Sequence, residues 1–160
     1  MSTPKDTKGA ELGALQAALA AEHAVVYGYG VVGGKIDDSR RGEARSAYDA
    51  HRARRDELAR AIRDVGGKPE VSAAAYALPF DVRDSAAAVR LAADLEERVA
   101  GVYSDLVRAS SGDRRRMAAE ALREAAVRAV RWRGESVAFP GLAERAAPSA
   151  TPVAATPSPS

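Results

Sequence analysis

Two glutamates stand on apolar helical stripes, and each is followed by a tyrosine at the same interval. Glu22 precedes Tyr29 within Glu22-His-Ala-Val-Val-Tyr-Gly-Tyr29, and Glu96 precedes Tyr103 within Glu96-Glu-Arg-Val-Ala-Gly-Val-Tyr103. A carboxylate on such a stripe is costly to bury unless a cation, a hydrogen-bond donor or a metal ion pairs with it. The sequence therefore predicts a buried polar site that these two segments share.

Two residues elsewhere in the chain extend this polar set. His51 and Glu124 fall on helical segments of their own, so that four helices can contribute to one interior site. Three carboxylates and one imidazole suit Fe(II) or Mn(II) better than a soft metal ion. One hypothesis is therefore a metal site that reduces peroxide or oxidises Fe(II) at open coordination places. Its ligands would be Glu22, His51, Glu96 and Glu124.

The same residues also fit a site without metal, in which arginine balances the carboxylates. Arg54 and Arg55 lie one turn beyond His51, and Arg128 lies one turn beyond Glu124. An arginine inside the site would neutralise carboxylates where a metal ion otherwise would, and it does not readily lose its proton. Buried ionic clusters of this kind help to specify a fold more reliably than they stabilise it. The second hypothesis is a structural cluster with no catalytic residue and no cofactor.

The composition limits the class of protein. The chain has 160 residues, enough for one domain with its own core, and it has no cysteine for disulfides or thiolate metal sites. The net charge is only +2, with acids and bases interspersed, which does not indicate nucleic-acid binding. No stretch approaches the ~20 apolar residues of a membrane span, and residues 12–21 continue into a helical pattern. We therefore expect a cytoplasmic protein without nucleic-acid or membrane partners.

Apolar residues recur at helical spacing in four segments, which predicts an all-α fold. We expect helices over about residues 10–32, 40–65, 85–110 and 114–133. Gly33-Gly34 and Gly66-Gly67 are predicted to end the first two helices, because glycine adopts the left-handed conformation at a helix end without steric cost.

A long connection, about residues 66–83, separates the second helix from the third. At ~3.3 Å per residue it can reach beyond ~50 Å, whereas a helix of about 25 residues is only ~37 Å long. The connection can therefore cross the whole fold and start the third helix at the same end as the second. Two antiparallel helix hairpins joined by one such crossover form a ferritin-like four-helix bundle.

The bundle is expected to occupy residues 10–145, with Phe139-Pro-Gly-Leu142 folded back over its end. Residues 1–9 are polar and contain Pro4 and Gly9, so that we expect a flexible arm. Residues 146–160 are rich in Ala, Pro, Ser and Thr and have too few large apolar residues to join a core, which predicts a disordered tail.

Four-helix di-metal carboxylate proteins place one Glu on each of two helices and a Glu-x-x-His on each of the other two. Glu22 and Glu96 take the single-carboxylate places. The second helix reads Tyr48-Asp-Ala-His51 and the fourth reads Glu124-Ala-Ala-Val127, so that each pair keeps only one of its two ligands. Four of six ligand positions remain, which indicates a degenerate di-iron site.

Four phrases carry a resemblance that covers about residues 10–145: Leu15-Gln-Ala-Ala-Leu-Ala-Ala-Glu-His23, Ala50-His-Arg-Ala-Arg-Arg55, Ala75-Tyr-Ala-Leu-Pro79 and Ala125-Ala-Val-Arg-Ala-Val-Arg-Trp-Arg133. They resemble the ferritin-like superfamily, and in particular the small ferritin-like domains of unknown function found in actinobacteria. The resemblance implies a helical bundle, often paired as a homodimer, without an established activity. Better-known relatives are ferroxidases, peroxidases and oxygenases.

The interpretation that these observations favour is a ferritin-like bundle with an incomplete di-metal site, acting as a non-catalytic structural or interaction module and forming a homodimer. The alternative is an iron- or manganese-binding protein with oxidase or peroxidase activity at the four candidate ligands. A third interpretation is an apolar ligand held between helices beneath the 66–83 crossover.

Overall fold

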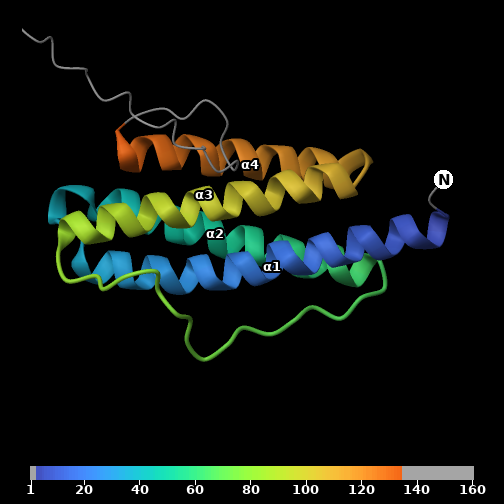
Figure 1. The fold of residues 1–160 in the computed structure, drawn as a ribbon, viewed down its shortest axis with the longest axis horizontal. Helices are drawn as coiled ribbons and strands as arrows, with labels where there is room; N and C mark the ends of the chain where they lie inside the picture. The colour runs from blue at the N-terminus through green and yellow to red at the C-terminus, as the bar shows by residue number, and fades with distance from the viewer. Residues whose placement is uncertain (1–2, 135–160) are drawn as a thin grey trace, which may run out of the picture.

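A computed structural model describes residues 3–134, which form four α-helices and no strand in that range. The predicted all-α class and the number of helices are confirmed for this part of the chain (Figure 1). The helices are α1 (Pro4–Lys35), α2 (Asp38–Asp64), α3 (Ser85–Ala109) and α4 (Gly112–Arg133). None of them is long and apolar enough to cross a membrane. The expected clip at residues 139–142 and the expected tail at 146–160 lie outside the described residues.

The first helix begins earlier than its apolar pattern predicts. Thr3 and Asp6 form a reciprocal capping box, in which Asp6 N donates to Thr3 Oγ1 and Thr3 N donates to Asp6 Oδ2. Pro4 occupies the first helical position, where its fixed φ is favourable and its missing N–H costs nothing. Residues 4–9, which the sequence assigns to an arm before the first helix, thus belong to α1.

Glycine ends α2 but not α1. Gly66 follows Val65, the C-cap residue of α2, and takes the left-handed conformation with φ of +86°, as predicted. Gly33 and Gly34 instead stay helical, and α1 continues to Lys35 before Ile36 turns into extended backbone. Ile36 is buried, so that packing of this side chain fixes the end of α1 where glycine was expected to do so.

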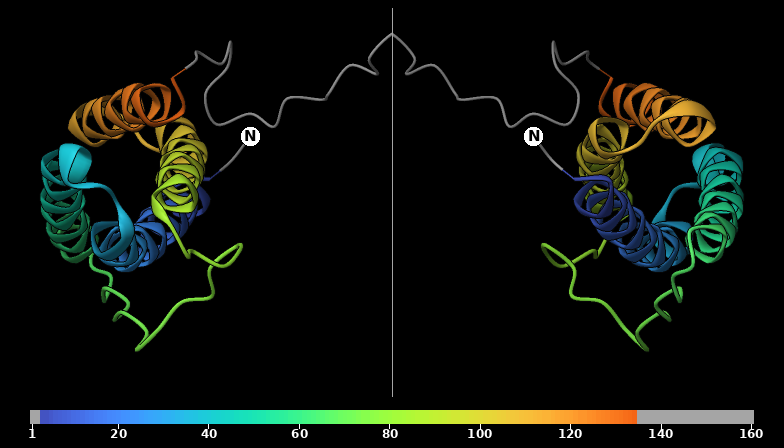
Figure 2. Two further views of the ribbon diagram at one scale, coloured as in Figure 1. Left: turned by 90° about the vertical axis from the view of Figure 1, so that its left-hand side faces the viewer. Right: turned by 90° about the vertical axis from the view of Figure 1, so that its right-hand side faces the viewer.

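The four helices pack side by side around a common core (Figure 2). Successive helices of each hairpin, α1 with α2 and α3 with α4, run in opposite directions, and α1 also packs along α3. The helices α2 and α4 are neighbours as well, but they contact each other much less. Small residues dominate the buried face of α4, including Ala118, Ala121 and Ala125, which lets its backbone approach the core closely.

The segment between α2 and α3 crosses the length of the bundle over α1 and α3 (Figures 1 and 2). Gln16 of α1 donates to the carbonyl of Lys68 at 2.7 Å and accepts from the amide of Glu70 at 3.2 Å. His23 Nε2 lies 3.1 Å from the Glu70 carbonyl oxygen, so that this histidine serves the crossover and not the interior site. Leu78, Phe80 and Val82 pack against the core, as expected for the apolar residues of the connection.

Candidate functional site

Glu22, His51 and Glu96 meet in the middle of the bundle, and each side chain is 0–1% exposed. They come from α1, α2 and α3, where each falls on the buried stripe of its helix. His51 Nδ1 lies 2.7 Å from Glu22 Oε2, and His51 Nε2 lies 3.0 Å from Glu96 Oε1. Because a carboxylate can only accept, both ring nitrogens must carry hydrogen to make both bonds. The arrangement therefore favours an imidazolium held between two carboxylates.

Each carboxylate also receives a tyrosine hydroxyl from the opposite helix. Tyr29 of α1 donates to Glu96 Oε1 at 2.5 Å, and Tyr103 of α3 donates to Glu22 Oε1 at 2.6 Å. Both tyrosines are 1% exposed. The equal Glu-to-Tyr interval on α1 and α3 thus has a structural reason, since the two helices exchange tyrosine donors.

The fourth helix completes the site on the Glu96 side. Arg128 Nε donates to Glu96 Oε1 at 2.9 Å, and Trp132 Nε1 donates to the Tyr29 hydroxyl at 2.8 Å. Glu96 Oε1 therefore accepts from Tyr29, His51 and Arg128 together, whereas Glu96 Oε2 is buried without a hydrogen-bond partner among the described residues. Two glutamates face one imidazolium and one guanidinium, so that the formal charges of the cluster balance.

Burial opposes the charged form of His51, but hydrogen bonds to Glu22 and Glu96 and the negative charges of both outweigh burial. The result is a His51 pKa raised from 6.5 to about 9. Burial and the nearby carboxylates also raise the pKa of Tyr29 and of Tyr103, because a phenolate would be desolvated beside a like charge. At neutral pH the site therefore contains a cationic histidine and two neutral tyrosines.

Glu124 does not join the other three candidate ligands. Its carboxylate accepts from Arg54 Nη2 at 3.1 Å, and its side chain is 38% exposed. Arg54 also pairs with Glu57, while Arg55 pairs with Asp56 toward solvent. Of the three arginines expected near the site, Arg128 is the one that contacts its central carboxylates.

An internal repeat explains why Glu124 does not lie at the site. The first and second hairpins carry matching residues at the same separation along the sequence. The pairs are Glu22 and Glu96, Tyr29 and Tyr103, Arg54 and Arg128, and the N-cap residues Asp37 and Ser111. At that interval His51 corresponds to Ala125, which is fully buried. Tyr48–His51 and Glu124–Val127 are therefore two residues out of register in the repeat. Val127, at the place where the motif has histidine, is 45% exposed.

Trp132 also belongs to the site, although the di-metal ligand motif contains no tryptophan. The sequence indicates only that Trp132 is buried, because the repeat interval pairs it with the buried Leu58 of α2.

No group of three or more histidine and carboxylate side chains in the described part of the chain is arranged to hold a metal ion. Both nitrogens of His51 and both oxygens of Glu22 already take part in hydrogen bonds within the protein.

The fold and the site define a class: an all-helical protein built from two similar hairpins around a buried Glu–His–Glu cluster. Residues 14–144 match the family described as Domain of unknown function (DUF4439), and the chain belongs to that family. No curated protein matches the chain. A solved structure, "Crystal structure of a conserved hypothetical protein, rv2844, from Mycobacterium tuberculosis", is similar, with 37% identity and a TM-score of 0.77. The match covers 79% of this chain and 96% of that one.

Proposed function

We propose that this protein is a ferritin-like helical module without catalytic activity, in which an ionic cluster stands where di-metal carboxylate proteins hold their metal ions. The observation that carries the proposal is the position of His51 between Glu22 and Glu96, with both ring nitrogens engaged. A protein cation thereby supplies the positive charge that the paired carboxylates require. The module would act by offering a rigid surface to a partner.

The arrangement of the helices supports the ferritin-like assignment. Ferritin-like folds join two antiparallel helix hairpins by one long crossover and point their carboxylates inward from facing helices. Here the crossover runs the length of the bundle between α2 and α3, and Glu22 and Glu96 face the interior from α1 and α3. The two hairpins also share one register, which is consistent with a repeated unit.

A metal-binding oxidase or peroxidase is the second candidate, and Glu96 Oε2 is the observation that favours it. A buried carboxylate oxygen without a partner is costly, and a cation would satisfy it. The remaining residues do not fit a metal ion as they lie. His51 would have to give up a carboxylate, Arg128 would have to leave Glu96, and Glu124 would have to exchange Arg54 for the interior.

Metal content and melting temperature distinguish the two candidates. Protein purified without chelators should contain iron and manganese well below one ion per chain, and adding either ion should leave the melting temperature unchanged. A metal that binds only the native state would raise the melting temperature as its concentration increases. Stoichiometric iron or manganese that is lost in Glu96→Gln, but kept in the exposed α4 control Glu120→Gln, would overturn the proposal.

We also propose that the module forms a homodimer through the α2–α4 side. Among the neighbouring helices this pair has the loosest contact, and Arg54 of α2 pairs there with Glu124 of α4. Val127 of α4 is a large exposed apolar side chain and follows Glu124 by three residues, about one helical turn. Sedimentation equilibrium over a concentration series up to about 100 µM should give a dimer that Val127→Glu dissociates, because burying a charge without a partner is costly. A monomer throughout that series, or a dimer indifferent to Val127→Glu, would contradict the proposed interface.

A further inference from the structure

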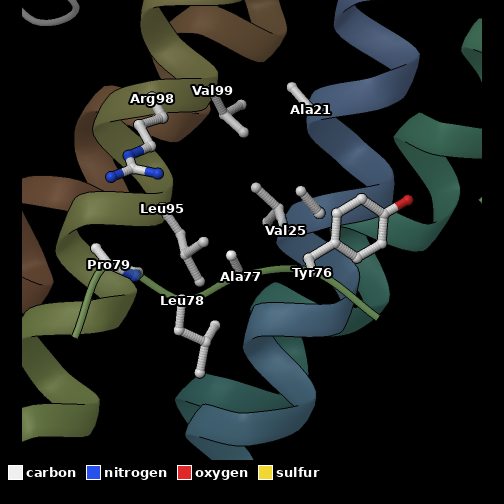
Figure 3. A pocket seen from close by; sticks show the side chains of 10 residues that line it. Ala21, Val25, Tyr76, Ala77, Leu78, Pro79, Leu95, Arg98 and Val99 are labelled. Atoms are coloured by element: carbon white, nitrogen blue, oxygen red, sulfur yellow. The ribbon is translucent and has the colours of Figure 1, made fainter. Parts of the chain in front are cut away.

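A small cavity lies beneath the crossover, between α1 and α3 (Figure 3). Its volume is about 160 Å³, and its walls include Ala21, Ala24 and Val25 of α1 and Leu95 and Val99 of α3. Residues 76–79 of the crossover form the remaining wall. The cavity is separate from the buried cluster, since Glu22, His51 and Glu96 do not line it.

Side-chain size explains the hollow. The small side chains of Ala21 and Ala24 leave space on α1. Residues 74–83 of the crossover, which pass over this space, make no backbone hydrogen bond to the described helices. That stretch is held by side chains instead, including Phe80, whose ring lies 5.3 Å from the Arg90 guanidinium carbon. An apolar cavity of roughly 150 Å³ holds one benzene molecule in a protein core. The space therefore suits an apolar group of about six carbon atoms.

Arg98 supplies one charge beside this apolar space. It is the single charged residue in the cavity lining, and it lies on the α3 side (Figure 3). Its guanidinium makes no ion pair or hydrogen bond with the described residues, although Asp94 lies one turn before it on the same helix. Many other arginines, such as Arg54, Arg114 and Arg128, are paired with a carboxylate of the chain.

We propose that this cavity binds a small monocarboxylate whose compact apolar body, such as a benzene ring, fills the space beneath the crossover and whose carboxylate pairs with Arg98. Arginine matches a carboxylate with two parallel N–H donors, which fixes the orientation of the ligand. The alanines admit the ring, and the side chains of Leu95 and Val99 cover it from α3. This site is independent of the proposed structural role of the Glu–His–Glu cluster.

Benzoate is the probe, and benzyl alcohol is its uncharged counterpart. Titration of isotope-labelled full-length protein, followed by amide chemical shifts, should give saturable changes at Ala21, Ala24, Leu95 and Val99 with a dissociation constant on the order of 1 mM. Arg98→Gln should weaken benzoate about fivefold and leave benzyl alcohol unchanged, because an exposed ion pair contributes about this factor. Arg98 is exposed, so that this substitution leaves the fold intact.

Two further variants make the test decisive. Ala24→Leu should fill the cavity and abolish binding of both probes, while Arg123→Gln, which removes an exposed arginine on α4, should change neither. The proposal is overturned if benzoate binds Arg98→Gln as tightly as the native protein, if the shift changes map to another surface, or if no saturation is reached at about 20 mM.

Discussion

Ala125 on α4 stands at the position in the second hairpin that His51 occupies in the first. Both positions are fully buried, yet one holds a methyl group and the other an imidazole. One histidine therefore serves both carboxylates, and the second carboxylate receives Arg128 in addition. This asymmetry within a repeated framework leaves Glu96 Oε2 without a partner among the described residues.

Replacing His51 should destabilise the protein strongly. In His51→Ala, Glu22 and Glu96 would lose their shared cation, and removing one partner of a buried ion pair costs about 3–5 kcal/mol. Urea unfolding followed by circular dichroism measures the change. His51→Gln should recover part of the loss through hydrogen bonding, whereas a His51→Ala variant within about 1 kcal/mol of the native protein would contradict the cluster.

Stability should fall as the pH rises from neutral to alkaline. The pKa of His51 is raised from 6.5 to about 9, so that its stabilisation is complete below pH 6.5 and is lost as the pH passes through 9. This shift corresponds to about 3 kcal/mol in the free energy of unfolding. Unfolding curves at several pH values should show the slope in the native protein and in His23→Gln, but not in His51→Gln. A native profile flat over this window would refute the shift.

The two tyrosines should differ in their coupling to α4. Tyr103→Phe removes the donor to Glu22 Oε1 and should cost about 1–3 kcal/mol. Tyr29→Phe removes a donor to Glu96 and also the acceptor of Trp132, although Glu96 Oε1 retains His51 and Arg128. A double-mutant cycle of Tyr29→Phe with Trp132→Phe should therefore show a coupling of about 0.5–3 kcal/mol. Strict additivity would show that this hydrogen bond contributes nothing measurable.

Two glycines of α1 should respond in opposite directions to alanine. A Cβ placed on Gly28 would lie 2.6 Å from Leu95 Cδ1, whereas one on Gly30 would meet no atom within 4 Å. Gly30→Ala should raise stability by up to about 1 kcal/mol through helix propensity. Gly28→Ala should lower it by about 1–3 kcal/mol, because Leu95 must move away from α1. Thermal unfolding of both variants tests the close contact of α1 with α3.

Periodicity predicted the helices well because packing dominates their formation. The predicted core residues Leu15, Leu19 and Leu58 are buried at 0–1% exposure, and the long crossover passes along the bundle as its length suggested. The ends were less predictable. Gly33-Gly34 carried a stop signal that the buried Ile36 overrides, and the capping box at Thr3 lay outside the apolar pattern. Helix ends thus depend on local capping and on tertiary contacts, neither of which the apolar spacing encodes.

The candidate site was predictable to the extent that its members follow the buried stripes. Glu22, His51 and Glu96 come together as their positions on those stripes indicated. Glu124 follows from analogy with a ligand motif, but its side chain points away from the buried stripe of α4, whose members include Ala121 and Ala125. The exchange of tyrosine donors between α1 and α3 required knowledge of which helices are neighbours.

That exchange of tyrosines has a consequence for how the chain folds. Each hairpin carries a glutamate whose tyrosine donor lies on the other hairpin, so that an isolated hairpin cannot supply all the hydrogen bonds that its buried carboxylate accepts in the native protein. An isolated hairpin would therefore be penalised for forming its core early, and the two should unfold in a single cooperative transition. Fragments made by cutting the crossover should accordingly be unstructured apart and regain helicity when mixed.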